Sequence, residues 1–281
     1  MVLCWSGNYI AAKIVFREIP ALMAMALRTM VSAVLMIGIW WRRPRGAASI
    51  WTRREMGILI ALGIFGMVLN QFFWTVGVAL TTVLDSSMIM ATTPIWVLLM
   101  AGIMGLEPIT FPKIGGMAIA MAGVAMLQIF RPALSAKSPT ILGDFLVLLC
   151  ALALAGMTAF GKKYKPQSGG VAVNAVGYIG GAVLLLPVLL FSSRGFDFAK
   201  VTPGAWLGVV YMGAISSVTG YLIYYYALAR ISASRMAAFQ YLQPVFAILM
   251  AVVMLGEELN GAAMAAGGVI FAGVYVTERF G

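Results

Sequence analysis

Long apolar stretches, separated by short polar or charged connections, restrict what this chain can fold into more than any other feature. A helix of about 20 apolar residues is long enough to cross the hydrocarbon core of a bilayer. Hydrophobic residues make up 62% of the 281 residues and charged residues only 10%. A soluble globule needs more polar surface than this composition supplies. The sequence therefore predicts a polytopic membrane protein.

Ten such stretches are delimited by clusters of charged residues, proline or glycine. The connections between them are mostly short, so we expect an all-α protein of ten transmembrane helices without a sizeable soluble domain. The predicted spans are residues 2–17, 20–41, 54–80, 82–104, 112–130, 141–162, 171–192, 204–229, 234–255 and 260–278.

Basic residues are divided unequally between alternate connections, with twelve on one side and five on the other. The positive-inside rule places the richer side in the cytoplasm. We therefore expect a multi-pass protein of the cell inner membrane with both termini cytoplasmic. The basic residues behind the net charge of +10 then determine the orientation of the chain in the membrane, and they do not indicate a nucleic-acid partner. The richer side comprises Arg42, Arg43, Arg45, Arg53, Arg54, Lys113, Lys162, Lys163, Lys165, Arg230, Arg235 and Arg279, and the poorer side Arg17, Arg131, Lys137, Arg194 and Lys200.

A proline inside an apolar span, followed thirteen residues later by an acid at the end of that span, occurs twice in the chain. Pro94 precedes Glu107, and Pro244 precedes Glu257. The two copies lie 150 residues apart, and Lys, Gly and Met residues elsewhere match under the same offset. Chance matching between apolar segments is the alternative to an internal duplication.

A duplication at this offset gives five spans in each half. Because five is odd, the second half enters the membrane from the opposite side, which makes an inverted-topology repeat. We predict that residues 1–130 form the first five-helix repeat and that residues 141–281 form the second, inverted one.

Several short motifs, in this order along the chain, resemble the ten-helix EamA-type members of the drug/metabolite transporter superfamily. The resemblance implies two inverted five-helix repeats that move metabolites or drugs by alternating access. Some members of that family export amino acids, aromatic ones included. The motifs are Trp5-Ser6-Gly7-Asn8-Tyr9 followed by Lys13, then Leu27-Arg28, Thr93-Pro94, Pro244-Val245-Phe246, and the acids Glu107 and Glu257.

The two matched prolines lie near the middle of their spans, and hence near mid-depth in the bilayer. Proline removes one helical hydrogen bond, which frees the carbonyls of Met90 and Gln240. Interrupted helices at matched positions of two repeats mark the substrate site of many transporters. We therefore predict that Pro94 and Pro244 act as hinges beside a substrate site. An ordinary kink, satisfied by a neighbouring helix, is the alternative.

Uncharged polar and aromatic side chains occur at similar depth in several spans, which predicts a wet, neutral-lined cavity. The alternatives are hydrogen bonds between helices and aromatic core packing. The predicted substrate-binding residues are Trp5, Asn8, Asn70, Gln71, Trp74, Thr92, Thr93, Thr158, Ser217, Tyr221, Gln240, Tyr241 and Gln243.

Charged residues are scarce within the spans. Lys13 and Lys163 lie near span ends, and we predict a gating role for them and for Glu107 and Glu257, which also suit helix caps. Arg28 lies two turns into its span. Its role is open between helix packing, a hydrogen bond to a backbone carbonyl and binding of a solute carboxylate. No acid lies at mid-depth, so we expect facilitated transport without proton coupling.

Small residues at four-residue spacing in the fifth and tenth spans predict close helix packing, with dimerisation as the alternative. The pairs are Gly116 with Ala120 and Gly268 with Ala272. We expect a monomer, with a homodimer as the alternative.

Several classes of function are excluded by composition. The chain has no histidine, which removes His-dependent catalysis and His-ligated metals, and its two cysteines, Cys4 and Cys150, offer no disulfide or metal framework. We expect no enzyme activity, no cofactor and no bound metal. The predicted function is export of small organic metabolites, above all amino acids, aromatic ones among them. The alternatives are a multidrug or cationic-compound exporter and a lipid flippase of the same fold.

Overall fold

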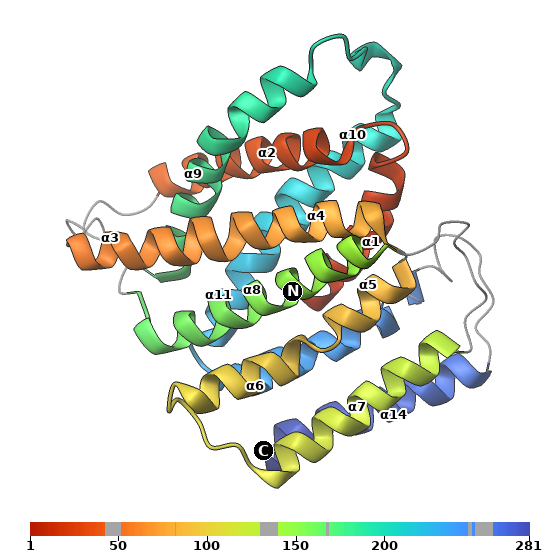
Figure 1. Cartoon of the computed structure of the whole chain (residues 1–281). Coiled ribbons are helices and arrows are strands. Elements are labelled where there is room, and N and C mark those ends of the chain that lie inside the picture. The colour runs from red at the N-terminus through yellow and green to blue at the C-terminus, as the bar shows by residue number, and fades with distance from the viewer. Residues whose placement is uncertain (43–51, 82, 130–139, 167–168, 247–248, 251–260) are drawn as a thin grey trace. The chain divides into compact units, whose positions relative to one another are not determined.

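The computed structural model describes residues 1–42, 52–81, 83–129, 140–166, 169–246, 249–250 and 261–281. Within these ranges every regular element is a helix, in agreement with the predicted all-α class (Figure 1). The chain forms two compact units, which we describe one at a time. Unit 1 comprises Met1, Leu3–Val76 and Tyr164–Ala229, and unit 2 comprises Val2, Gly77–Lys163 and Arg230–Gly281.

Unit 1 is built around two long helices that pack against each other, α2 and α9. Two further helices each pass through a π-helical middle segment, η2 and η4, in which backbone hydrogen bonds span five residues instead of four. The elements are α1 (Val2–Val15), α2 (Ala21–Trp41), α3 (Arg53–Ile60), η2 (Ala61–Leu69), α4 (Asn70–Leu80), α9 (Gly169–Ser192), η3 (Phe198–Lys200), α10 (Pro203–Val210), η4 (Tyr211–Thr219) and α11 (Gly220–Leu228), with α4 continuing past the end of the unit at Val76.

The ends of these helices follow from local sequence. Thr52 caps α3 by accepting a hydrogen bond from the Glu55 backbone N–H, and Thr202 caps α10 by accepting one from Ala205. A threonine at this position satisfies one of the donors that a helix start leaves free. Pro203 follows directly as the first residue of α10, where its missing N–H costs nothing.

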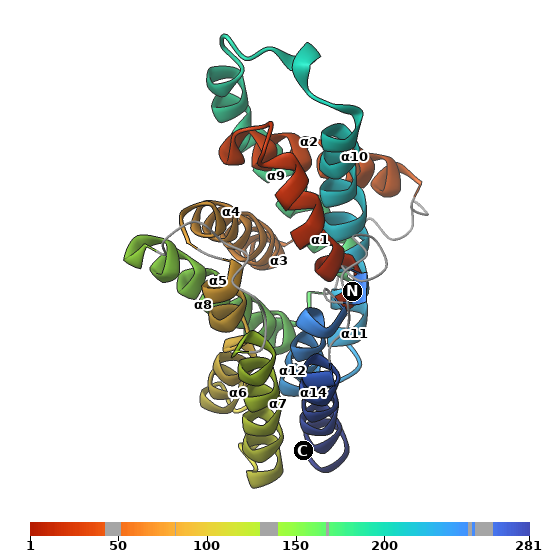
Figure 2. The same cartoon turned by 90° about the vertical axis from the view of Figure 1, so that its right-hand side faces the viewer.

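Unit 2 contains a pair of helices, α7 and α14, that lie side by side in both views (Figures 1 and 2). Its other elements include two helices that are interrupted partway along. The elements are α5 (Val83–Met90), α6 (Thr93–Ile103), α7 (Phe111–Ile129), α8 (Ile141–Tyr164), α12 (Ala233–Ala238), η5 (Phe239–Leu242) and α14 (Gly261–Phe280).

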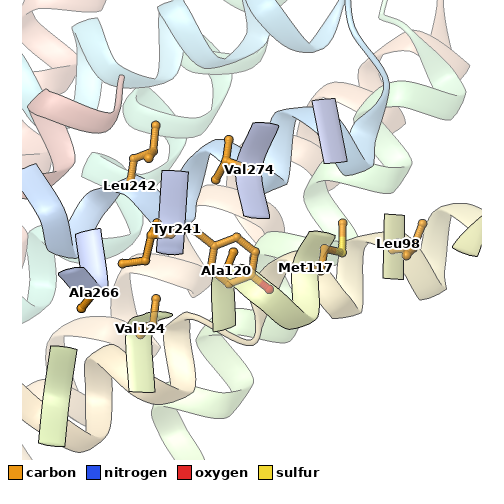
Figure 3. Packing of buried hydrophobic residues seen from close by; sticks show 9 residues of the cluster. Leu98, Met117, Ala120, Val124, Tyr241, Leu242, Ala266 and Val274 are labelled. Atoms are coloured by element: carbon orange, nitrogen blue, oxygen red, sulfur yellow. The ribbon is translucent and has the colours of Figure 1, made fainter. Parts of the chain in front are cut away.

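The core of unit 2 lies between α7, α14, α6 and the 3-10 turn η5 (Figure 3). Small residues bring the backbones of α7 and α14 together: a Cβ atom added to Gly273 lies 2.6 Å from the Gly116 carbonyl oxygen. The close packing predicted for Gly116 and Ala120 is thus confirmed. The prediction for Gly268 is wrong, because Gly268 is exposed with open space beside it. The helix faces its neighbour with Gly273, five residues further on.

Five of the described helices are long and apolar enough to cross a membrane, and two shorter apolar helices accompany them. The five are Ala21–Trp41, Arg53–Leu80, Ile141–Tyr164, Gly169–Ser192 and Pro203–Leu228. These segments coincide with predicted spans to within two residues at each end, as expected for a membrane protein. The total of ten spans stays a prediction.

Element boundaries recur under the 150-residue offset. The segment Arg53–Ile60, Ala61–Leu69 and the helix from Asn70 correspond to Pro203–Val210, Tyr211–Thr219 and the helix from Gly220. The compact units divide the chain differently from the predicted repeats, because each unit takes elements from both halves of the sequence. The inverted arrangement of the repeats stays a prediction.

Candidate functional site

Unit 1 contains a buried group of polar side chains beside the π-helical segments. The Gln71 amide nitrogen donates to the Tyr178 hydroxyl at 3.0 Å, and the Tyr221 hydroxyl donates to Asn70 Oδ1 at 3.2 Å. These bonds connect α4 with α9 and α11. All four side chains are at most 5% exposed, so each bond replaces hydration that the fold has removed.

The same group extends to α1, α2 and η4. The Arg28 guanidinium donates to the Ser217 hydroxyl at 2.8 Å and to the Met212 carbonyl at 3.4 Å. The Trp5 indole N–H donates to the Ser216 carbonyl at 3.1 Å, and its ring meets the Tyr221 ring edge-on at a centroid distance of 5.3 Å. We define the polar cluster as Trp5, Arg28, Asn70, Gln71, Tyr178, Ser217 and Tyr221.

Widened turns supply part of this geometry. The Ser217 hydroxyl donates at 2.8 Å to the Met212 carbonyl, five residues earlier, which is a bond that the π-helical course of η4 permits. From α2, the Ser32 hydroxyl donates to the Gly213 carbonyl at 3.0 Å. Gly213 allows this approach, because an added Cβ would lie 2.9 Å from the Arg28 carbonyl oxygen. The π segment thus places Ser217 against Arg28 of α2.

Three predicted residues of unit 1 lie outside the polar cluster. Asn8 is 7% exposed, and its Oδ1 has no hydrogen-bond partner among the described residues. Trp74 is buried and meets the Tyr9 ring edge-on at 5.7 Å. Lys13 is exposed in the last turn of α1, as a residue at the end of a span is expected to be.

In unit 2, the helix that contains Pro94 is broken rather than kinked. α5 ends at Met90, residues 91–92 form a turn, and α6 begins at Thr93 with Pro94 in its first turn. The Thr93 hydroxyl donates to the Met90 carbonyl at 2.6 Å, so the carbonyl freed by the proline is satisfied within the chain. The Thr92 hydroxyl accepts from the Trp96 indole at 3.0 Å.

The helix that contains Pro244 is interrupted at the matching place. α12 gives way to the 3-10 turn Phe239–Leu242, and α-helical residues resume at Gln243. The Gln240 carbonyl accepts from the Gln243 backbone N–H, while Gln240 Nε2 is buried without a partner in the part of the chain that the structure describes. Tyr241 is 1% exposed and belongs to the apolar core of Figure 3, beside Leu242 and Val274.

Thr158 and Lys163 belong to neither polar group. Thr158 donates to the Leu154 carbonyl at 2.6 Å within its own helix, and Lys163 is exposed near the end of α8. Glu257 falls outside the described residues. The predicted site residues are therefore shared between the two units, and the described contacts join Trp5, Asn70, Gln71, Ser217 and Tyr221 into one group.

Glu107 lies at the centre of a second polar group, in the connection between α6 and α7. α6 ends at Ile103 and is closed by the left-handed Gly105 (φ +67), after which the Leu106 N–H bonds back to the Ala101 carbonyl. Glu107 Oε2 accepts from Lys113 Nζ at 2.7 Å, and Oε1 accepts from the Ser234 backbone N–H at 2.9 Å. The Ser234 hydroxyl also donates to Oε2. Glu107 thus caps the first turn of α12.

The electrostatics of this group are strong because both charges are buried, with 3% of the Lys113 side chain and 6% of the Glu107 side chain exposed. Burial raises the pKa of Glu107. The hydrogen bonds from Lys113 and Ser234 outweigh that effect, so the pKa of Glu107 lies below its ordinary value. The carboxylate is therefore charged at neutral pH, and it ties the 104–110 connection to α12.

Sequence reasoning did not select three residues that the structure places in these groups. Arg28 was recognised as an unusual charge without an assigned partner, whereas Tyr178 and Lys113 gave no separate signal. One signal was present for Tyr178, because it lies 150 residues after Arg28, as Tyr221 lies 150 residues after Gln71.

The whole chain is similar to known membrane transporters. The EamA-like transporter family matches the chain twice, over residues 1–129 and 141–279. A "probable terminal-alkyne amino-acid exporter" of Streptantibioticus cattleyicolor is 29% identical, over 85% of this chain and 76% of its own length. A "probable amino-acid metabolite efflux pump" of Salmonella typhimurium is 25% identical, over 98% and 91%.

Other relatives carry names that specify only a transporter. One crystal structure superposes with a TM-score of 0.82 at 18% sequence identity, covering 99% of this chain and 94% of its own. At that identity the likeness shows the fold alone.

Proposed function

Because the chain belongs to the EamA-like transporter family, we propose that this membrane transporter exports small organic metabolites, above all amino acids, across the cell inner membrane. The observation that carries the proposal is the polar cluster of unit 1. Buried polar groups in an apolar helical protein are costly, and they mark solute pathways in membrane proteins. Relatives named as amino-acid exporters support amino acids as the solute class.

The proposed mechanism is alternating access between two inverted repeats. The recurrence of element boundaries at 150 residues supports such repeats, and so does the double match of the family. The polar cluster as defined contains no aspartate or glutamate, and the ion pairs among the described residues lie outside it. The cluster therefore offers no side chain that binds a proton and a cationic solute in turn. This favours facilitated movement of the solute down its gradient.

Uptake into proteoliposomes tests the proposed function. The purified protein should equilibrate radiolabelled neutral amino acids several-fold faster than protein-free vesicles do, with equal rates with and without a pH gradient. Tetraphenylphosphonium and a fluorescent lipid analogue serve as the competing solutes. Transport of the cation alone would favour the multidrug alternative, and scrambling of the lipid alone would favour the flippase.

Replacement of the two prolines at the helix breaks tests the proposed hinges. We expect Pro94→Ala with Pro244→Ala to lower the amino-acid uptake rate by about tenfold, because restored helix hydrogen bonds straighten the two interrupted helices. The protein should still insert, as measured by its amount in the membrane and its elution in size-exclusion chromatography. Pro187→Ala is the matched control, because α9 continues through Pro187 without a break. Uptake unchanged in the double variant would refute the hinge role.

A further inference from the structure

Arg28 is a buried cation for which the described chain supplies no anion. The residue is 3% exposed on α2, a helix long and apolar enough to span the membrane. The ion pairs found among the described residues are Lys113 with Glu107 and Lys200 with Asp197, and neither involves Arg28. The hydrogen-bond acceptors of its guanidinium are the neutral Ser217 hydroxyl and Met212 carbonyl. Its Nε–H is buried without a partner in the described ranges.

A purely structural role does not account for this charge. The Met212 carbonyl already accepts from the Ser217 hydroxyl at 2.8 Å, a shorter contact than the 3.4 Å from Arg28. The neighbouring carbonyl oxygen, that of Gly213, lies 3.0 Å from the Ser32 hydroxyl, which shares its one proton with the Arg28 carbonyl oxygen at 2.8 Å. Neutral hydroxyl groups thus already contact the carbonyl oxygens of Met212 and Gly213, so these two acceptors do not require a charged partner. A permanent charge inside a membrane helix is expensive, and it is found where function requires it.

The surroundings of Arg28 suit an organic acid. The guanidinium is a planar fork of donors that matches a carboxylate with two parallel hydrogen bonds. Tyr178 and Tyr221 lie close enough to interact with it electrostatically, and they add aromatic faces and hydroxyl groups. Asn70 and Gln71 contribute amides through their bonds to these two tyrosines.

The position of Arg28 within the duplicated sequence supports the same conclusion. Arg28 and Tyr178 are 150 residues apart, and so are Gln71 and Tyr221. Positions that correspond in two repeats come together in one group here, where an inverted repeat would have its central axis. Solute sites of such transporters lie at the interface of the repeats.

We infer that Arg28 binds the carboxylate of the transported solute, so that the carrier selects organic acids and amino acids over amines that lack a carboxylate. The inference rests on the proposed function, which it deepens by naming the recognised group. Ser217 is a positioning residue, because its hydroxyl accepts a hydrogen bond from the guanidinium and so orients it.

The test compares solutes that differ only at the carboxylate. Uptake of L-phenylalanine and of L-phenylalaninamide is measured with the full chain in proteoliposomes, and the ratio of the two rates is compared between variants. The ratio is internal to each variant, so a lower yield of folded protein does not change it. We expect Arg28→Gln to lower the ratio by about 30-fold or more, the loss typical for truncation of one partner of a buried charge pair.

Arg28→Lys keeps the charge without the planar fork, and it should give an intermediate ratio. This second variant preserves a test if the neutral glutamine variant does not fold. Arg42→Gln removes an exposed arginine at the other end of the same helix and should leave the ratio at the wild-type value. A wild-type ratio in both Arg28 variants would overturn the inference, while uptake of phenylalanine by the wild type would uphold the proposed function.

A binding measurement separates the inference from the proposed function. Should the wild type move neither solute, thermal stabilisation in detergent by phenylacetate, with phenethylamine as the matched amine, tests the site directly. Stabilisation by phenylacetate that is lost in Arg28→Gln, or weakened in Arg28→Lys, would support the anion site although amino-acid transport had failed. Equal effects of phenylacetate and phenethylamine on the wild type would overturn the inference.

Discussion

Leucine in place of Gly273 should prevent α7 and α14 from packing and should lower the free energy of unfolding by about 3 kcal/mol or more. A Cβ atom at this position would lie 2.3 Å from the Ala120 backbone nitrogen and 2.6 Å from the Gly116 carbonyl oxygen. Both are backbone atoms of the facing helix, so no side-chain rotation relieves the overlap. Thermal unfolding of the detergent-solubilised protein, followed by size-exclusion chromatography, measures the effect.

The same helix provides the control for this prediction. Gly268 has no atom within 4 Å of an added Cβ and is exposed. Gly268→Leu should therefore change the unfolding free energy by no more than about 0.5 kcal/mol, as surface substitutions generally do. Equal stabilities of the two variants would show that the described contact between α7 and α14 does not hold the unit together.

Loss of Lys113 should have the second large effect, because it leaves the Glu107 carboxylate buried without its cation. Removing one partner of a buried ion pair costs about 3–5 kcal/mol. Lys113→Met, which keeps most of the side-chain volume, should destabilise the protein by that amount in the same unfolding assay. Adding Glu107→Gln should restore part of the loss, because the double variant buries no unpaired charge.

An exposed ion pair in the chain provides the comparison. Lys200 Nζ and Asp197 Oδ2 are 3.3 Å apart with 84% and 52% of their side chains exposed, so Lys200→Met should cost less than about 1 kcal/mol.

The dependence of stability on pH follows from the lowered pKa of Glu107. A depressed pKa stabilises the folded state above the ordinary carboxyl value, and that contribution is lost as the pH falls through the lowered one. The unfolding free energy of Glu107→Gln should not show this loss at low pH. A wild-type unfolding free energy that changes as little in acid as that of Glu107→Gln would contradict the prediction.

The sequence predicted the five long apolar helices well, because the bilayer leaves little choice. An apolar stretch of sufficient length must satisfy its backbone internally, so it becomes a helix of nearly the same bounds. The predicted span 54–80 appears as Arg53–Leu80, and 20–41 as Ala21–Trp41. The interruption near Pro94 was also predictable, since proline cannot continue a helix hydrogen-bond ladder. That the break falls at residues 91–92, with Thr93 pairing the freed carbonyl, depends on local packing.

The candidate site was predicted only in part. Polarity within an apolar span identified Asn70, Gln71, Ser217 and Tyr221, yet it did not reveal their partners. Arg28 meets Ser217 across 189 positions of sequence, and a contact so distant leaves no local pattern. Glu107 was predicted as a cap or gate from its place at a span end, and it does cap a helix. The capped helix is α12, which begins more than a hundred residues later.

The two π-helical segments determine the angular phase of the helices that follow them. An α-helix turns by about 100° per residue, and a stretch bonded over five residues turns by less. Every side chain after η2 and η4 is therefore rotated about its axis relative to an uninterrupted α-helix. Asn70 and Gln71 are the first two residues after η2, and Tyr221 is the second residue after η4. The direction of these three side chains is thus set by the nine-residue segments η2 and η4, which themselves contain only Ser217 of the polar cluster.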